Sequence, residues 1–227
     1  MAETGVKRGP GRGKFITFEG GEGSGKSTQI KMLAQRLEAA GVRNIRTREP
    51  GGSPGAEIIR HVLLSGVGKL LGPEAETLLF AAARDDHVRT VILPALNQGT
   101  WVLCDRFFDS TRAYQGSLGQ VSPDILNALQ RVTIGDLKPD LTLILDVPVE
   151  VGMRRAAARR GSDSADRFES EDMVFHEGLR AAYRKIAADD PERCVLIDAT
   201  DDADSVGQAV WSVVRQHLAP ATAASPA

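Results

Sequence analysis

The chain of 227 residues has two cysteines, almost no net charge and no long apolar run. Two cysteines cannot form a disulfide framework, and the apolar surroundings of Cys104 (TWVLCDRF) and Cys194 (CVLIDAT) predict buried, reduced thiols. The net charge of -2, from 28 basic and 30 acidic side chains, gives no sign of a nucleic-acid partner. No apolar stretch approaches the roughly 18 residues of a membrane-spanning helix, and the N-terminal residues lack the apolar core of a signal peptide. We therefore expect a cytoplasmic protein that binds neither nucleic acid nor a membrane.

The composition is that of one globular domain with a sizeable core. Hydrophobic residues make up 42% and charged residues 26%, and single domains commonly reach this length. Residues 1–14 (MAETGVKRGPGRGK) are rich in glycine and basic side chains without periodicity, so we expect a flexible N-terminal tail, with an electrostatic tether as the alternative. Residues 219–227 should form a flexible C-terminal tail. The functional domain then spans residues 15–218.

Short apolar runs alternate with helix-period segments along this domain. Ile30, Leu33 and Leu37 would share one face of a helix. Another helix should begin at Ser122-Pro123, a capping residue followed by proline. Such alternation predicts a three-layer α/β fold, in which helices flank a five-stranded parallel β-sheet and ligands bind at the carboxyl ends of the strands. The predicted strands are residues 15–19, 44–48, 101–105, 141–146 and 194–198.

The stretch FITFEGGEGSGKSTQI has the spacing of a phosphate-binding loop between a predicted strand and a predicted helix, as in the P-loop NTPase fold. Glycines in this pattern let backbone N–H groups converge on a polyphosphate at a helix N-terminus. Lys26 would lie along the β- and γ-phosphates of the ligand, and the Ser27 hydroxyl would ligate Mg²⁺. A plain glycine-rich turn is the alternative. The predicted ATP-binding residues are Gly20, Gly21, Glu22, Gly23, Ser24, Gly25, Lys26, Ser27 and Thr28.

Glu22 is unexpected in an anion-binding loop, because its carboxylate would repel phosphate. It should therefore face a hydrogen-bond donor, and a hydroxyl group is the natural candidate.

Five motifs in this order resemble bacterial thymidylate kinases, which are P-loop nucleoside monophosphate kinases: FEGGEGSGKST, TREPGG, LLFAAARDDH, DRFFDSTRAYQG and DRFESED. The resemblance covers roughly residues 15–218. It implies an enzyme that transfers the γ-phosphate of ATP to dTMP, giving dTDP and ADP in dTTP synthesis, with Mg²⁺ as cofactor. It also implies a homodimer and a short lid at about residues 154–168.

The motif DRFFDSTRAYQG would supply catalytic and acceptor-binding residues. Asp105 closes a predicted strand, as a carboxylate that holds Mg²⁺ opposite Ser27 should. The resemblance makes Arg106 the clamp on the α-phosphate of dTMP, a role suited to its bidentate fork. Glu22, as a catalytic residue, would meet the 3′-hydroxyl of the acceptor. The resemblance also implies an acceptor-pocket wall, with core packing as the alternative for its tyrosine, formed by Thr111, Tyr114 and Gln115.

Phe80 and Arg84 lie four residues apart in LLFAAARDDH, so on a helix they would face one ligand. The resemblance implies that Phe80 stacks on thymine and that Arg84 donates to its O4 atom. Without the resemblance, Phe80 would be interpreted as a core residue and Arg84 as a solvated charge. Arg60 is expected near the acceptor phosphate, and Arg48 is expected to organise a loop.

Members of the family place a catalytic cation either in the phosphate-binding loop or in the lid. Gly23 stands where the first kind has arginine, so the lid should supply the cation in this chain. Arg155 and Arg159 would share a helical face, with Arg155 at ATP and Arg159 in catalysis. The adjacent Arg160 leaves the identity of the catalytic arginine open, and a solvated charged face is the alternative.

Two other functions compete with this prediction. A nucleotide-dependent switch or ATPase, in which hydrolysis drives a partner, would use the same loop. The guanine-reading motif Asn-Lys-x-Asp is absent from the sequence, which counts against a GTPase. A kinase for nucleosides or for other monophosphates is the nearer alternative. Arg106 and Arg60 favour an acceptor that already carries a 5′-phosphate.

Overall fold

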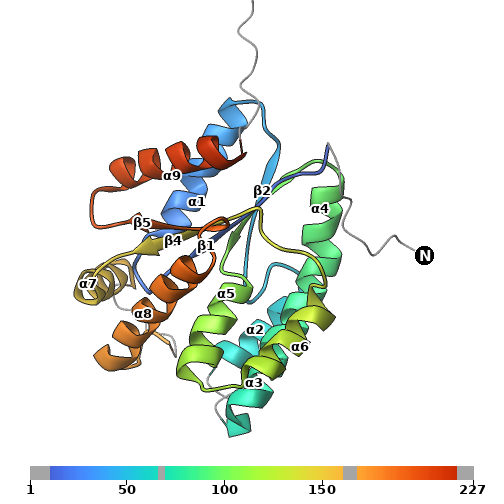
Figure 1. Ribbon diagram of the computed structural model, residues 1–227, viewed down its shortest axis with the longest axis vertical. Helices are drawn as coiled ribbons and strands as arrows, with labels where there is room; N and C mark the ends of the chain where they lie inside the picture. The colour runs from blue at the N-terminus through green and yellow to red at the C-terminus, as the bar shows by residue number, and fades with distance from the viewer. Residues whose placement is uncertain (1–10, 66–69, 161–167, 219–227) are drawn as a thin grey trace, which may run out of the picture.

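The computed structural model describes residues 11–65, 70–160 and 168–218, and within them five parallel strands form one sheet (Figure 1). The strand order is β2-β3-β1-β4-β5, so β1 is central. In the register of β1 with β3, Phe18 pairs with Asp105, which brings the carboxyl ends of these two strands together. The strands occupy the predicted residues: β1 (Phe15–Glu19), β2 (Asn44–Arg48), β3 (Trp101–Asp105), β4 (Leu141–Asp146) and β5 (Cys194–Asp198).

Helices connect the strands and cover both faces of the sheet, which confirms the three-layer arrangement (Figure 1). The helix predicted at Ser122-Pro123 begins there, and the Ser122 hydroxyl accepts a hydrogen bond from the Ile125 N–H. In the described ranges the helices are α1 (Lys26–Ala39), α2 (Pro54–Leu64), α3 (Gly72–His87), α4 (Leu93–Asn97), α5 (Phe108–Thr111), α6 (Pro123–Thr133), α7 (Val149–Arg160), α8 (Met173–Asp189) and α9 (Ala203–Leu218), with π-helical turns η2 (Val88–Ile92) and η3 (Arg112–Leu118).

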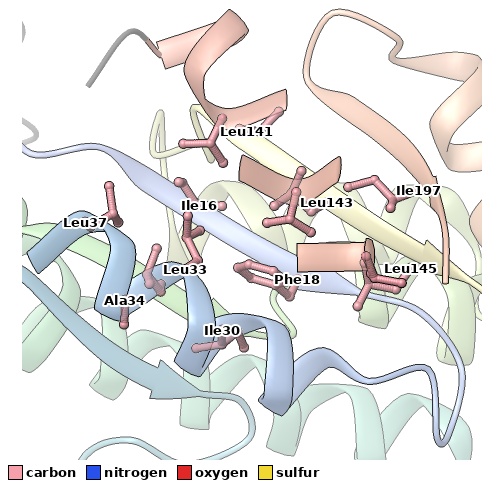
Figure 2. Packing of buried hydrophobic residues seen from close by; sticks show 14 of the residues in the cluster. Ile16, Phe18, Ile30, Leu33, Ala34, Leu37, Leu141, Leu143, Leu145 and Ile197 are labelled. Carbon is pink, nitrogen blue, oxygen red and sulfur yellow. The ribbon is translucent and has the colours of Figure 1, made fainter. Parts of the chain in front are cut away.

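The face of the sheet that α1 and α9 cover holds a large hydrophobic cluster (Figure 2). Ile30, Leu33 and Leu37 project from α1 toward the sheet, where Ile16 and Phe18 of β1 lie, as their spacing predicts. None of these five side chains is more than 5% exposed. Burying a side chain of this size contributes about 1.5–3 kcal/mol, so this packing holds the start of α1 next to the end of the central strand.

The opposite face of the sheet carries the helices that approach the functional site. Phe15 of β1 packs edge-on against Phe107 there, with ring centroids 4.9 Å apart. Because alternate residues of a strand point to opposite faces, Thr17 and Glu19 share this face with Phe15. A carboxylate therefore lies at the end of the central strand, on a face that is otherwise largely apolar.

The folded domain begins earlier than the sequence predicts. Arg12 donates to Asp140 at 3.0 Å, and the Gly13 N–H donates to the carbonyl of Leu96 at 2.9 Å. The assignment of residues 12–14 to a flexible tail is therefore wrong, because contacts with distant segments hold them. Residues 1–10 and the predicted tail at residues 219–227 lie outside the described residues.

Two predictions from composition can be compared with the fold. Both cysteines are buried free thiols, as predicted. Burial raises the pKa of the Cys104 thiol well above its usual value, so this thiol stays protonated. In the part of the chain that the structure describes, no helix is both long enough and apolar enough to cross a membrane.

Candidate active site

A cavity of about 340 Å³ lies at the carboxyl ends of β1, β2 and β3, where parallel sheets bind ligands. Its walls come from the loop after β1, the turns after β2 and β3, α2, α3, η3 and the end of α7. Of the residues that the sequence predicts for the site, all line this cavity except Gly20, Gly21 and Arg155. The cavity therefore joins the phosphate-binding loop to the residues expected around an acceptor.

The loop between β1 and α1 has the geometry of an anion-binding loop. Gly20 and Gly25 adopt φ angles of 131° and 94°, which residues with side chains rarely adopt. A Cβ atom at Gly20 would also lie 2.4 Å from the Leu145 carbonyl oxygen. Within the described residues, no side chain caps α1, which begins at Lys26. The first N–H groups of α1 can therefore bind an anion, and the helix dipole favours it.

Lys26 folds back over this loop. Its Nζ donates to the carbonyl oxygens of Gly20 at 3.0 Å and Gly21 at 2.8 Å, and the residue is 8% exposed. Burial lowers the pKa of Lys26 to about 8, with Arg106 adding to the effect and Glu22 opposing it. A buried ammonium with only neutral hydrogen-bond acceptors is well placed to exchange them for phosphate oxygens.

Ser27 and Asp105 meet between the loop and β3. Ser27 Oγ donates to Asp105 Oδ2 at 2.9 Å, and both residues line the cavity. Hydroxyl and carboxylate oxygens are hard ligands of the kind that Mg²⁺ takes together with water and phosphate oxygens. The described residues contain no cluster of three or more His, Cys, Asp or Glu side chains that could hold a metal alone. The pair therefore fits a Mg²⁺ ion, whose remaining ligands would come from substrate and water.

Arg106 and Glu22 form an ion pair in the cavity. Arg106 Nη2 donates to Glu22 Oε1 at 2.7 Å, and the Tyr114 hydroxyl lies 3.3 Å from the same oxygen. Burial would raise the pKa of Glu22, but Arg106 and Lys26 outweigh it and lower the pKa to about 2. Glu22 is thus an anion that faces donors, as its place in the loop predicts, although its main partner is a guanidinium.

Glu19, to which no sequence motif assigns a role, is fully buried at the end of β1. Its carboxylate accepts hydrogen bonds from the Phe107 N–H at 2.8 Å, from Ser110 Oγ at 2.6 Å and from the Tyr183 hydroxyl at 3.1 Å. Burial, with the neighbouring Asp109 carboxylate, raises the pKa of Glu19 to about 7. The signal in the sequence was an acidic residue that closes a buried strand directly before the glycine loop.

Glu19 should make the stability of the fold depend on pH. Its pKa is about 7 in the folded protein against 4.5 when unperturbed, so the folded state binds this proton more tightly than the unfolded state. The resulting stabilisation is complete below the unperturbed pKa of 4.5 and is lost as the pH rises to about 7. We expect the free energy of unfolding to fall by at most about 3 kcal/mol through this group between about pH 5 and about pH 8.

Urea unfolding at several pH values tests this expectation. In Glu19→Gln the free energy of unfolding should decrease less with rising pH, because an amide does not titrate. Glu38→Gln, on the exposed side of α1, should leave this pH dependence unchanged. The comparison uses the change with pH, so a constant loss of stability in Glu19→Gln does not affect it. Equal slopes for the parent and Glu19→Gln would show that Glu19 is not the titrating group.

Arg84 is buried, at 6% exposure, and is held by an ion pair. Its Nε donates to Glu49 Oε2 at 2.6 Å. Its Nη2 donates to the Phe107 carbonyl and to Thr111 Oγ1, both at 3.1 Å. His87 Nδ1 lies 3.1 Å from the other Glu49 oxygen. The interpretation of Arg84 as a solvated charge is therefore wrong, and Glu49 is a partner that sequence analysis missed.

Phe80 and Gln115 line the same region as Arg84. Phe80 is half-buried and lies one helical turn before Arg84 on α3. Gln115 is buried, and its amide nitrogen donates to Glu76 Oε1 at 3.1 Å. An aromatic ring, a guanidinium and an amide thus meet in one pocket, which suits a flat ligand with polar edges.

Two further arginines line the cavity beside the turn after β2. Arg60 Nη1 donates to the Pro50 carbonyl at 2.6 Å, and Arg48 pairs with Glu57 at 2.9 Å. The ion pair of Arg48 spans the turn, in keeping with a loop-organising role. Both cations raise the positive potential of the cavity, which favours an anionic ligand.

Comparison with known proteins agrees with this geometry. A family model described as thymidylate kinase matches residues 18–210, which include every residue that lines the cavity. The chain belongs to the thymidylate kinase family. A thymidylate kinase of Bradyrhizobium sp. (strain ORS 278) is 76% identical over 99% of this chain and 100% of its own length. Thymidylate kinases of Bradyrhizobium diazoefficiens and Nitrobacter winogradskyi are 73% and 70% identical, over 98% and 100% of this chain and 98% and 99% of their own lengths.

The structure gives a reason why this member of the thymidylate kinase family has glycine at residue 23 of its loop. Gly23 has a φ angle of +65°, and a Cβ atom there would lie 1.9 Å from the carbonyl oxygen of Gly152 on α7. A Cβ atom at Gly152 would in turn lie 2.5 Å from the Glu22 carbonyl oxygen. Because α7 packs directly on the loop, there is no room for an arginine at residue 23.

The two arginines expected in the lid of this thymidylate kinase family member lie in different surroundings. Arg159 lines the cavity, has a side chain that is 62% exposed and pairs with Glu169 at 2.8 Å. Arg155 instead donates to the carbonyl oxygens of Ala199 and Thr200, both at 2.7 Å, in the loop after β5. The structure brings Arg159 to the loop and leaves Arg155 outside the cavity. Residues 161–167 of the expected lid and the side chain of Arg160 lie outside the described residues.

Proposed function

We propose that the protein transfers the γ-phosphate of ATP to dTMP, giving dTDP and ADP in dTTP synthesis. The observation that carries the proposal is a single connected cavity with a phosphate-binding loop and a pocket for a flat, polar-edged ligand. Arg106 and its neighbour join the two parts: Arg106 bonds to Glu22 of the loop, and the Phe107 carbonyl bonds to Arg84. Membership of the thymidylate kinase family and the names of the relatives support the same reaction.

The loop and the start of α1 would hold ATP through backbone N–H groups. Lys26 would leave the carbonyl oxygens of Gly20 and Gly21 and contact the β- and γ-phosphates. Ser27 and Asp105 would hold Mg²⁺, which neutralises charge on the phosphates when it is bound. Arg155 would border ATP from the loop after β5 that it contacts.

Arg106 would bind the α-phosphate of dTMP, with Arg60 nearby, because a guanidinium matches two phosphate oxygens at once. Glu22 and Tyr114 would face the deoxyribose, where the carboxylate can accept a hydrogen bond from the 3′-hydroxyl. A phosphate oxygen of dTMP attacks the γ-phosphorus of ATP as the bond to the β-phosphate oxygen breaks. The residues act by positioning and charge stabilisation, and none forms a covalent bond.

The base of dTMP would lie on Phe80. Arg84 would donate to O4 of thymine, with Gln115 and Thr111 completing the wall of the pocket. Arg84 is already fixed by Glu49, so it would meet the base without a change of rotamer.

A coupled assay over a panel of nucleoside monophosphates tests the proposal. We expect dTMP to be the best acceptor, dUMP to lose less than dCMP, and dCMP to lose at least about tenfold in kcat/KM. Thymidine without its phosphate should not be turned over. Equal turnover of dCMP and dTMP, or ADP release that is indifferent to any acceptor, would overturn the assignment.

Arg159→Ala should lower kcat by about an order of magnitude and leave the KM for dTMP nearly unchanged. The reason is that Arg159 lies at the loop, where its charge would meet the transferring phosphate, and Gly23 cannot supply one. Steady-state kinetics measure kcat and the KM for dTMP separately. Lys185→Ala, which removes an exposed cation of α8, serves as control. Parental kcat in each of the three single variants, Arg159→Ala, Arg155→Ala and Arg160→Ala, and in their triple variant would refute a lid cation.

We also propose a cytoplasmic homodimer. Two buried free thiols fit a reducing compartment. Large apolar side chains are exposed on α2, α3 and α6, which lie together on one side of the molecule: Ile58 at 71%, Leu78 at 54% and Val132 at 80% (Figure 1). Exposed large apolar side chains favour a partner surface, and sedimentation equilibrium measures whether the protein forms dimers.

A further inference from the structure

Glu19 connects the central strand to the turn that carries Arg106. The turn follows β3, and two of its consecutive backbone N–H groups are held by the end of β1. The Arg106 N–H donates to the Phe18 carbonyl at 2.9 Å, and the Phe107 N–H donates to Glu19 Oε1 at 2.8 Å. Glu19 therefore lies directly before Gly20, the first residue of the phosphate-binding loop, and one hydrogen bond links its carboxylate to the residue after Arg106.

The backbone of Arg106 needs such support. Its φ angle is +68°, in the left-handed region that residues with side chains seldom adopt. Strained conformations of this kind persist only where the surroundings hold them. The hydrogen bonds on both sides of the Arg106 α-carbon, from its own N–H and from the next, supply that support.

The side chain of Arg106 reaches the same carboxylate through two hydroxyls. Arg106 Nη1 donates to the Tyr183 hydroxyl at 3.0 Å and lies 3.3 Å from Ser110 Oγ. These two oxygens are 2.9 Å apart, and both bond to Glu19 Oε2. The Glu19 carboxylate, which is closed to solvent, thus binds the backbone of the turn directly. It reaches the Arg106 guanidinium through the side chains of Ser110 and Tyr183.

We propose that Glu19 is a positioning residue for the acceptor phosphate: it fixes the backbone and the guanidinium of Arg106 in the orientation that binds dTMP. The inference rests on the proposed function, since it takes Arg106 as the ligand of the acceptor. Glu19 itself touches neither substrate. It acts through Arg106 alone, whereas the loop that holds ATP is built from backbone N–H groups and Lys26.

An amide at residue 19 cannot reproduce this arrangement. A carboxylate accepts at both oxygens, as the three donors require. In Glu19→Gln, an oxygen turned to the Phe107 N–H leaves the amide nitrogen facing Ser110 and Tyr183. Those hydroxyls would then receive donors from both residue 19 and Arg106, so the hold on the guanidinium weakens. Tyr183→Phe weakens it differently, because it deletes one bridging hydroxyl and keeps the ring.

Steady-state kinetics of the full-length protein test the proposal through the split between the two substrates. Glu19→Gln and Tyr183→Phe should each raise the KM for dTMP about tenfold and keep the KM for ATP within about twofold. Because both act through one chain of hydrogen bonds, the double variant should show much less than the product of the two effects. Thr17→Val is the matched control, since it removes a buried hydrogen bond to Thr142 from the same face of β1, away from Arg106.

Amide exchange of the segment 106–111 provides a readout that needs no acceptor. Glu19→Ala should exchange faster there than the parent and Thr17→Val, because the Phe107 N–H loses its partner. If the parent fails to phosphorylate dTMP, the proposed function fails, and the exchange data still decide whether Glu19 holds the turn. A rise in the KM for ATP equal to that for dTMP, parental kinetics in both variants, or unchanged exchange would overturn the positioning role.

Discussion

Lys26→Ala is expected to lower kcat by about 10²-fold or more while the fold persists. Lys26 would place its charge on the transferring phosphate, and among the described residues its Nζ donates to two carbonyl oxygens of the loop and to the Ser24 hydroxyl. Its folded pKa of about 8 lies below the usual 10.5, so holding the protonated side chain destabilises the folded state at neutral pH. Removing it should therefore leave the melting temperature unchanged or raise it.

A coupled assay and calorimetry measure these two quantities together. Lys26→Met keeps most of the apolar stem and should behave like Lys26→Ala, which shows that the charge matters and the packing does not. Lys31→Ala removes an exposed lysine from the same helix and should change neither quantity. Near-parental turnover of Lys26→Ala with an unchanged melting temperature would refute the role of the loop in phosphoryl transfer.

Arg84→Ala should reduce turnover of dTMP far more than turnover of dCMP, so that the ratio between them narrows. Thymine presents a carbonyl at position 4, and cytosine presents an amino group that would leave an Arg84 donor unpaired in a buried pocket. One such unpaired donor costs about 1–3 kcal/mol, and a cost near the middle of that range lowers kcat/KM of the parent for dCMP at least about tenfold. Without the guanidinium, the pocket no longer discriminates between thymine and cytosine at position 4.

The structure adds a second expected effect of Arg84→Ala. Among the described contacts, the substitution leaves the buried Glu49 carboxylate beside the His87 ring without its guanidinium partner, and breaking a buried ion pair costs about 3–5 kcal/mol. Because stability could confound activity, the ratio of kcat/KM values is the decisive measurement. Arg84→Lys keeps a charge for Glu49 but lacks the planar fork, so it should recover stability and still narrow the ratio. An unchanged ratio in both variants would show that Arg84 does not read the base.

Local patterns identified most of the elements of the fold. Four of the five strands are short apolar runs, whereas β2 has a single apolar residue, Ile45. The helix α1 follows from the spacing of Ile30, Leu33 and Leu37. The phosphate-binding loop also depends on neighbours in the chain, because glycines must lie directly between the strand and the helix. Such signals span fewer than about twenty residues, so they survive without knowledge of the tertiary structure.

The partners of the site residues depend on the order of the strands. Arg84 and Glu49 are 35 residues apart, and Glu19 and Tyr183 are 164 apart. No local spacing predicts that these residues meet. The same reason explains the error at the N-terminal tail, where Arg12 finds Asp140 at a separation of 128 residues.

By itself, the sequence determined the α/β class, the strands, the phosphate-binding loop and, through ordered motifs, the thymidylate kinase family. Only the tertiary structure decided that β1 lies between β3 and β4, and this placement puts Glu19 beside the turn of Arg106. It also decided that α7 packs against Gly23, which leaves no room for a side chain at that residue. The physical reason is that periodicity and loop chemistry act along the chain, whereas buried ion pairs and close backbone contacts act across a sheet whose strand order no local pattern encodes.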